Sequence, residues 1–216
     1  TLTSRPGTTS SFGALTTKDV KALQDEQLAP DIASVSPVVN ASVTATFSGA
    51  TYQPSQFFGA PPPIAAARDY SVASGSFFSA DDEESHERVV VVGQTVVANL
   101  FAGSDPIGQT IKLNGVGFRV VGVLESKGSN GFQDQDDVII APLSATQDTL
   151  AGGTTISQIV VQATSSSTVD EAETEIYSAL SSTHPADSSG SYNFRVLNQA
   201  SLLETTNSTN RTFTVL

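Results

Sequence analysis

The sequence predicts an α+β fold in which a discontinuous α/β subdomain, built from both ends of the chain, carries an inserted mostly-β subdomain. Three observations predict it: a helix followed by strands near the start, a β-rich middle, and a strand–helix–strand order near the end. We expect the α/β subdomain at residues 15–76 and 153–197 and the insertion at residues 77–152. Residues 1–14 are expected to be a lead-in segment.

The N-terminal part is expected to open with a helix. Thr16 and Asp19 have the spacing of a capping box, so the helix is expected to begin at Thr16 or Thr17 and to end at Pro30. Its predicted apolar face consists of Val20, Leu23 and Leu28. Strands are predicted next at Ile32–Val35, Ala41–Phe47 and Ser55–Ala60.

The middle of the chain contains two strongly apolar runs. Val89–Val92 consists of β-branched residues, which favour a buried strand, and a short helix is predicted directly after it at Gln94–Phe101. Val138–Ala141 is predicted to be another strand. Pro142 is expected to open a short helix, because proline is well tolerated in the first helical turn.

Two tight turns are predicted inside the insertion. Asn114-Gly115 tolerates positive φ at both central positions and therefore predicts a type I′ hairpin. In Asp105-Pro106-Ile107-Gly108, Pro106 fixes φ and Gly108 can take positive φ, which predicts a sharp turn into a strand. The strands expected around the hairpin turn are Thr110–Leu113 and Phe118–Leu124. We assign a fold-making and not a catalytic role to Asp105, Pro106, Gly108, Asn114, Gly115, Gly122 and Pro142.

The C-terminal part returns to a strand–helix–strand order. A strand with at least one strongly apolar face is predicted at Ile156–Ala163. Thr168 and Glu171 have capping-box spacing and are expected to open a helix. Its apolar stripe consists of Val169, Ala172, Ile176 and Leu180. A short strand is predicted at Asn193–Val196, and 199–216 has only a weak helical tendency because it is rich in Thr and Asn.

Composition excludes several functions. The chain has 22 Asp and Glu residues against 10 Lys and Arg residues, a formal net charge of −12, which argues against nucleic acid or anionic lipid as a partner. It has no Cys, which excludes thiol catalysis, zinc ribbons and disulfide scaffolds. The sequence contains neither a P-loop nor a GxSxG motif. We therefore predict no catalytic residue and no cofactor in this segment.

Two groups of side chains suggest a metal site, and each has a plainer interpretation. His86 lies in an acidic run whose carboxylates favour a charged imidazole, and a solvated loop is the favoured interpretation. His184 is expected to be exposed in a Ser-rich loop. Asp134, Asp136 and Asp137 begin like an EF-hand loop but lack its turn glycine and its closing Glu. We favour a polar loop that ends at a strand, and we predict no metal site.

Four aromatic residues cluster in the sequence around the triple proline at 61–63. Tyr52, Phe57, Phe58 and Tyr70 are candidates for an exposed lip that binds a partner. For the two Phe residues the core is the competing interpretation, because strand side chains of this size usually pack inward.

A series of motifs resembles a known family. The series consists of Gly75-Ser76-Phe77-Phe78, DPIGQTI at 105–111, FRVVGVL at 118–124 and DDVIIAPL at 136–143. It resembles the extracytoplasmic core domain of MacB/FtsX-type ABC transporter permeases, across residues 75–150 above all. The DPIGQ segment followed by FRVVGVL is the specific part of the resemblance.

The resemblance implies a porter-like α/β subdomain with an inserted sabre-like subdomain, on the extracytoplasmic face of the cell membrane. Residues 1–14 and 198–216 would then be stalk segments that lead to flanking transmembrane helices. An ABC ATPase domain or subunit would act from the cytoplasm, and its movement would reach this domain through the stalks. The implied partners are the rest of the permease, the ATPase, and an adaptor or a substrate protein or peptide. The isolated domain is expected to be a monomer.

Two other functions stay open. A free-standing secreted or surface-anchored module that binds a glycan or peptide would have a signal peptide and an anchor in place of flanking membrane helices. A secreted hydrolase would use a pair of carboxylates, and substituting Asp and Glu residues in pairs would test it.

Overall fold

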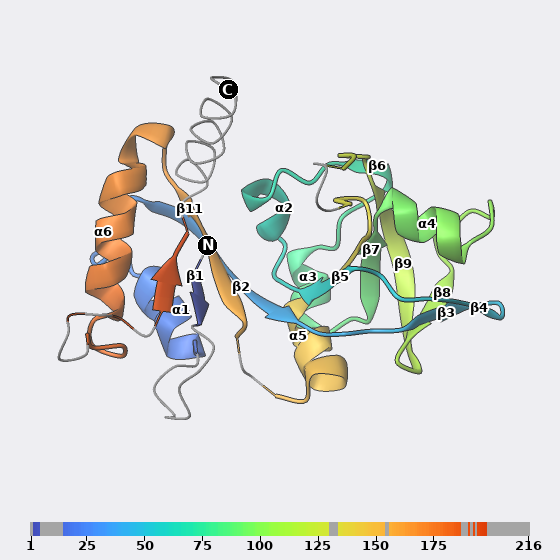
Figure 1. Ribbon diagram of the computed structural model, residues 1–216, viewed down its shortest axis with the longest axis horizontal. Helices are drawn as coiled ribbons and strands as arrows, with labels where there is room; N and C mark the ends of the chain where they lie inside the picture. Colours follow the sequence, from blue (N-terminus) through green and yellow to red (C-terminus); the bar gives the residue numbers. More distant parts are fainter. Residues whose placement is uncertain are drawn as a thin grey trace, which may run out of the picture.

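The computed structural model describes residues 2–4, 15–129, 134–153, 156–186, 190, 192 and 194–197. Within these residues twelve strands form one mixed sheet with two lobes, and the α+β prediction is confirmed (Figure 1). The strands are β1 Leu2–Ser4, β2 Ile32–Asn40, β3 Ala45–Phe47, β4 Ala50–Tyr52, β5 Gln56–Gly59, β6 Val72–Gly75, β7 Val89–Val92, β8 Thr110–Leu113, β9 Val116–Leu124, β10 Val138–Ala141, β11 Gln158–Ala163 and β12 Phe194–Val196. The helices are α1 Thr17–Leu23, α2 Ile64–Ala67, α3 Ala80–Glu84, α4 Gln94–Leu100, α5 Leu143–Thr146 and α6 Val169–Leu180.

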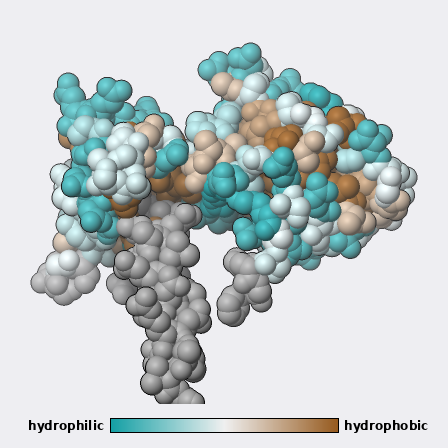
Figure 2. Space-filling view, turned by 90° about the horizontal axis from the view of Figure 1, so that it is seen from above, coloured by the Kyte–Doolittle hydropathy of each residue, from teal (hydrophilic) through white to brown (hydrophobic). Residues whose placement is uncertain are grey.

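Strand β2 belongs to both lobes. Its residues from Ile32 to Val38 pair with β11, and Val39 and Asn40 pair with Gly59 and Phe58 of β5. The order β12-β1-β11-β2-β5-β10-β7-β9-β8-β3-β4 therefore runs through the molecule without a break. We call β12, β1, β11, β2, α1 and α6 the first lobe, and the part from β5 to β4 in this order, with β6 and the remaining helices, the second lobe. Figure 2 shows a narrower waist where they meet.

The predicted strands Ile32–Val35 and Ala41–Phe47 differ from the structure. One nine-residue strand, β2, continues through Ser36-Pro37 to Asn40, and β3 begins only at Ala45. Pro37 lacks an N–H and is unfavourable inside a sheet, but residues 35–39 are buried throughout. Tertiary packing thus overrides the local signal.

Helices α1 and α6 cover the sheet of the first lobe. Thr16 caps α1 with Asp19 in the predicted capping box. The helix ends at Leu23, earlier than predicted, because the chain turns at Asp25, whose carboxylate accepts a hydrogen bond from the Gln27 backbone N–H. Leu28 is consequently 50% exposed and does not belong to the apolar face.

Helix α6 begins as predicted and is capped differently. Thr168 makes no side-chain cap to α6, because its hydroxyl accepts a hydrogen bond from the Ser165 backbone N–H in a preceding 3₁₀ turn. The predicted Thr168–Glu171 capping box is therefore wrong. The apolar stripe is confirmed for Ala172, Ile176 and Leu180, which are buried. The segment 199–216 lies outside the described residues.

The central strands of the second lobe are buried on both faces. Val90 and Val92 face a core that includes α4, and Val89 and Val91 face a core that includes Ile64 of α2. All four valines have no exposed surface, so the predicted buried strand is confirmed. Strand β10 alternates between the same two cores.

Two turns organise the outer strands of the second lobe. Asn114 and Gly115, with φ of 48° and 88°, connect β8 to β9. The Asp105 carboxylate accepts a hydrogen bond from the Ile107 N–H, and Gly108 has a φ of 77°. The Gly108 N–H donates to the Val120 carbonyl at 2.8 Å, which holds this turn against β9.

Some strands from the first 76 residues lie in the second lobe. β3 pairs with β8, and β6 pairs with β9. The division of the chain into subdomains at residues 76 and 152 stays a prediction.

Gly122 allows β6 to approach β9 closely, and replacing it with alanine tests this packing. A Cβ at Gly122 would lie 2.4 Å from the Ser76 carbonyl oxygen. We expect Gly122→Ala to lower the free energy of unfolding by about 2 kcal/mol, measured by urea denaturation with circular dichroism. In the control Gly117→Ala, on the same strand, the nearest contact is at 3.4 Å, and we expect a loss below about 0.5 kcal/mol. Equal losses would contradict this account.

Candidate functional site

The joint between the lobes is the candidate functional site. At this joint the backbone carbonyl of Val38 accepts a hydrogen bond from the Ser157 N–H at 2.9 Å, and the Asn40 N–H donates to the Ser157 hydroxyl at 3.0 Å. A cavity of about 470 Å³ opens beside these contacts, lined from β2, β5, β11 and the end of α2. We call it the joint cleft. It is a place where an external ligand can touch both lobes at once.

The structure separates the four aromatic candidates. Phe57 and Phe58 are neighbours on β5, so their side chains enter different cores and are 5% and 2% exposed. Tyr52 is half-buried and donates a hydrogen bond to the Asp137 carboxylate at 2.9 Å. Tyr70 is half-buried near the joint. The four do not form one exposed lip, and a partner at any of them stays a prediction.

Burial raises the pKa of both Tyr52 and Tyr70. Burial, with the Asp137 carboxylate as the second cause, raises the pKa of Tyr52 to about 12, so its hydroxyl stays a neutral donor. Burial also raises the pKa of Tyr70 above its ordinary value, against the opposing effect of the adjacent Arg68 guanidinium.

The carboxylates expected in a polar loop at Asp134–Asp137 bind backbone and hydroxyl groups. Asp136 and Asp137 are each only 8% exposed. Asp136 accepts hydrogen bonds from the Lys127 and Gly128 N–H groups, and Asp137 accepts one from the Ser55 N–H. Burial raises the pKa of Asp136, but the hydrogen bonds outweigh this effect and hold the pKa below its ordinary value. The described residues contain no cluster of three or more metal-ligating side chains.

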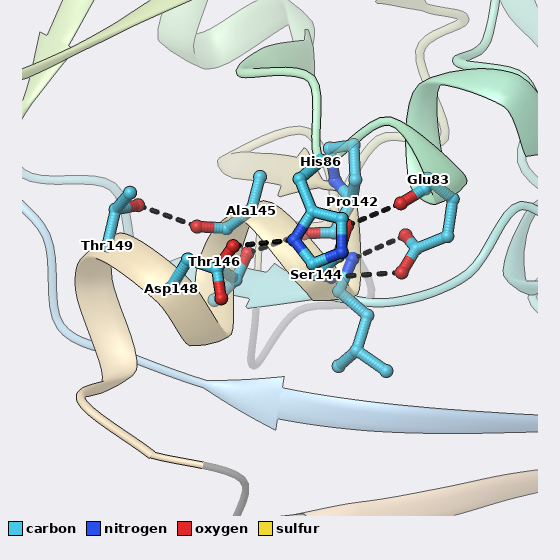
Figure 3. A network of polar contacts seen from close by, with 9 residues as sticks. Glu83, His86, Pro142, Ser144, Ala145, Thr146, Asp148 and Thr149 are labelled. Atoms are coloured by element: carbon cyan, nitrogen blue, oxygen red, sulfur yellow. Dashed lines mark hydrogen bonds and ion pairs between the residues drawn. The ribbon is translucent and has the colours of Figure 1, made fainter.

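The acidic run around His86 contacts α5 and the turn that follows it (Figure 3). The Glu83 carboxylate accepts hydrogen bonds from the Leu143 and Ser144 N–H groups at 2.7 and 2.9 Å. His86 contacts Asp148 through Nδ1 at 2.6 Å, with both side chains more than half exposed. The interpretation as a solvated loop is therefore wrong for Glu83, which caps a helix that begins 60 residues later in the chain.

His184 is buried and not exposed, which corrects the prediction. It is 3% exposed, and its Nε2 lies 3.1 Å from a carboxylate oxygen of Asp19, which has no exposed surface. Asp19 also accepts hydrogen bonds from the Thr16 N–H and the Thr183 hydroxyl, both at 2.7 Å. Burial raises the pKa of Asp19, but the hydrogen bonds from Thr183, His184 and Thr16 outweigh it and lower the pKa. Asp19 thus joins the start of α1 to the loop after α6.

Sequence reasoning missed Arg68 and Gln158 at the joint cleft. The one available signal was Arg68 itself, a basic residue that follows an apolar segment in a strongly acidic chain.

A family model described as the MacB-like periplasmic core domain matches residues 1–179. The chain belongs to this family. It is 38% identical over 206 residues to the macrolide export ATP-binding/permease protein MacB of Rhodospirillum rubrum, covering 94% of this chain and 30% of that protein. It is 34% identical over 221 residues to MacB of Azoarcus sp. strain BH72, covering 100% of this chain and 32% of the relative. The chain spans about a third of the length of these relatives.

Solved structures of related regions share the fold. The periplasmic region of MacB from Actinobacillus actinomycetemcomitans matches with a TM-score of 0.77 and 21% identity, over 95% of this chain and 91% of that one. The extracellular domain of the ABC-type transporter YknZ from Gram-positive bacteria matches with a TM-score of 0.73 and 18% identity, over 91% and 98%. Among the described helices, none is long and apolar enough to cross a membrane.

The Asp19 site makes a prediction about pH. Because the pKa of Asp19 is lowered in the folded state, the ionised carboxylate stabilises the fold above its ordinary pKa of 3.8, and this contribution is lost as the pH falls below that value. We expect Asp19→Asn to lower the free energy of unfolding by about 2 kcal/mol at neutral pH. The difference in this free energy between the variant and the unmodified chain should become smaller in acid. Urea denaturation at stepped pH measures both. The exposed control Asp25→Asn should show neither effect, and a gap that does not change with pH would count against the role of the Asp19 charge.

Proposed function

We propose that this chain is the extracytoplasmic domain of an ABC transporter permease subunit, where it couples ATP-driven movement in the cytoplasm to the handling of a substrate or partner outside the membrane. Membership of the MacB-like periplasmic core domain family supports this proposal. The segment itself would be non-catalytic, with the ATPase in another domain or subunit. Its partners would be the flanking membrane helices, the ATPase, and an adaptor or a substrate protein or peptide.

One observation carries the coupling. The first and last described strands, β1 and β12, pair with each other through Leu2–Val196, Thr3–Arg195 and Ser4–Phe194 (Figure 1). Membrane helices attached beyond these strands would therefore act on one point of the first lobe. β1 also pairs with β11, and β11 pairs with β2. Backbone hydrogen bonds thus form a continuous path from both chain ends to the second lobe.

A sheet is a suitable element for this task. Each ladder on this path pairs at least two residues of each strand, so a displacement of β1 and β12 is expected to move the neighbouring strands with it. Strand β2 has its residues 35–39 buried, and separating it from β11 or β5 would expose apolar surface. The sheet is therefore expected to move as a unit, and the second lobe to follow the first.

Spin labels test the coupling in the full-length transporter. The chain has no Cys, so a label at Glu171→Cys, exposed on α6, is unique within it. We expect pulsed electron spin resonance to show a different distance distribution between labelled copies with ATP and vanadate than without nucleotide. A second label at Ala98→Cys on α4, with unlabelled copies in excess, should give an intrachain distance that nucleotide leaves unchanged. If the distance between labelled copies does not respond to nucleotide, or if the intrachain distance does, the coupling proposal is wrong.

A further inference from the structure

The joint cleft has the size and the lining of a ligand site. Its volume of about 470 Å³ falls within the range of about 300–1,000 Å³ typical of small-molecule sites. Three side-chain amides line it, from Asn40, Gln56 and Gln158, together with the hydroxyl-bearing Ser42 and Ser55. No Asp or Glu of the described residues lines the cleft, although the chain has 22 of them.

The lining comes from both lobes. Gln158 stands at the start of β11 in the first lobe, and Gln56 stands at the start of β5 in the second. Asn40 is the last residue of the shared strand β2. A ligand in the cleft would therefore contact each lobe and the strand that joins them.

Arg68 supplies the charge at this site. Its guanidinium carbon lies 4.8 Å from the centre of the Phe58 ring, and both residues line the cleft. This cation–π contact holds the guanidinium at the wall of the cleft. In the described part of the chain no carboxylate lies within ion-pair distance of Arg68, and its polar neighbour is the Tyr70 hydroxyl.

A second cation lies beside Arg68. The Lys127 ammonium donates a hydrogen bond to the Arg68 carbonyl at 2.8 Å and lies 4.9 Å from the centre of the Tyr70 ring. Lys127 itself does not line the cleft, so the positive charge in the lining comes from Arg68. The positive charge of Arg68, in a cleft that no carboxylate of the described residues lines, attracts anions even though the net charge of the chain is negative.

We propose that the joint cleft binds a carboxylate-bearing ligand, with the Arg68 guanidinium contacting the carboxylate and the side-chain amides of Asn40, Gln56 and Gln158 hydrogen-bonding its polar groups. A planar guanidinium matches a carboxylate with two parallel hydrogen bonds, which gives this residue its specificity. The ligand is either a small carboxylic acid or the C-terminus of a peptide. Because both lobes would contact it, the bound ligand would stabilise their observed relative position.

Nuclear magnetic resonance titration of the ¹⁵N-labelled 216-residue chain tests the site. The probes are N-acetyl-Gly-Gly with a free carboxylate, its C-terminal amide, and succinate. We expect saturable shifts of the side-chain amide signals of Asn40, Gln56 and Gln158 with a Kd of about 1 mM or below for a free carboxylate, and none for the amide. Binding of the peptide alone identifies a peptide C-terminus as the ligand class, and binding of succinate identifies a small acid. Absence of saturable shifts with both carboxylates overturns the proposal, as does equal binding of the amide.

Variants assign the binding to Arg68. We expect Arg68→Gln to weaken carboxylate binding at least about tenfold, and the control Arg119→Gln, exposed on β9, to leave it unchanged. Gln158→Ala, which keeps Arg68, should also weaken carboxylate binding. It provides the test of the site if Arg68→Gln does not fold. Equal affinity in Arg68→Gln, Gln158→Ala and the unmodified chain would show that the shifts arise elsewhere and would overturn the proposal.

Discussion

The backbone pairing of β2 with β11 on one side and with β5 on the other is the constraint on which the two-lobed structure depends. The residues of β2 from Ile32 to Val38 pair with β11, and only Val39 and Asn40 pair with β5. The connection is short, but it is reinforced by the Ser157 contacts and by the burial of Val38 and Val39. Because Val38 and Val160 pack in a core that also holds strands β7 and β10, the joint is part of the second lobe's interior and not a linker.

In this acidic chain, buried carboxylates are stabilised mainly by hydrogen bonds from backbone N–H and hydroxyl groups. Among the described residues both ion pairs involve a histidine, and the important carboxylates accept hydrogen bonds from N–H and hydroxyl groups. Glu83 caps α5, Asp137 holds the loop before β5, and Asp19 joins α1 to the loop after α6. Such charge-assisted hydrogen bonds need no Lys or Arg partner. This leaves Arg68 available to a ligand at the joint cleft, which is lined from both lobes.

Features with a local cause could be predicted from the sequence. The Thr16–Asp19 capping box and the buried run Val89–Val92 depend on a few neighbouring residues, and the structure contains both. Long-range contacts could not be predicted, because nothing near Asp19 indicates a partner at Thr183, 164 positions away. The joint cleft was missed for the same reason, since its lining comes from three distant strands and a helix end. Burial by distant elements also explains why β2 continues through Pro37.

Native-state hydrogen exchange at the joint tests most directly the claim that the two lobes move as one sheet. The measured amides are those of Ser157 and Ala41, which donate to the carbonyls of Val38 and Phe57, compared with amides of β7 and β11. If the lobes move as one sheet, the joint amides exchange with the same free energy of opening as the amides inside the lobes, and with the same dependence on denaturant. A lower free energy of opening at the joint than in both lobes would show that the lobes separate while each stays folded, and would contradict the account.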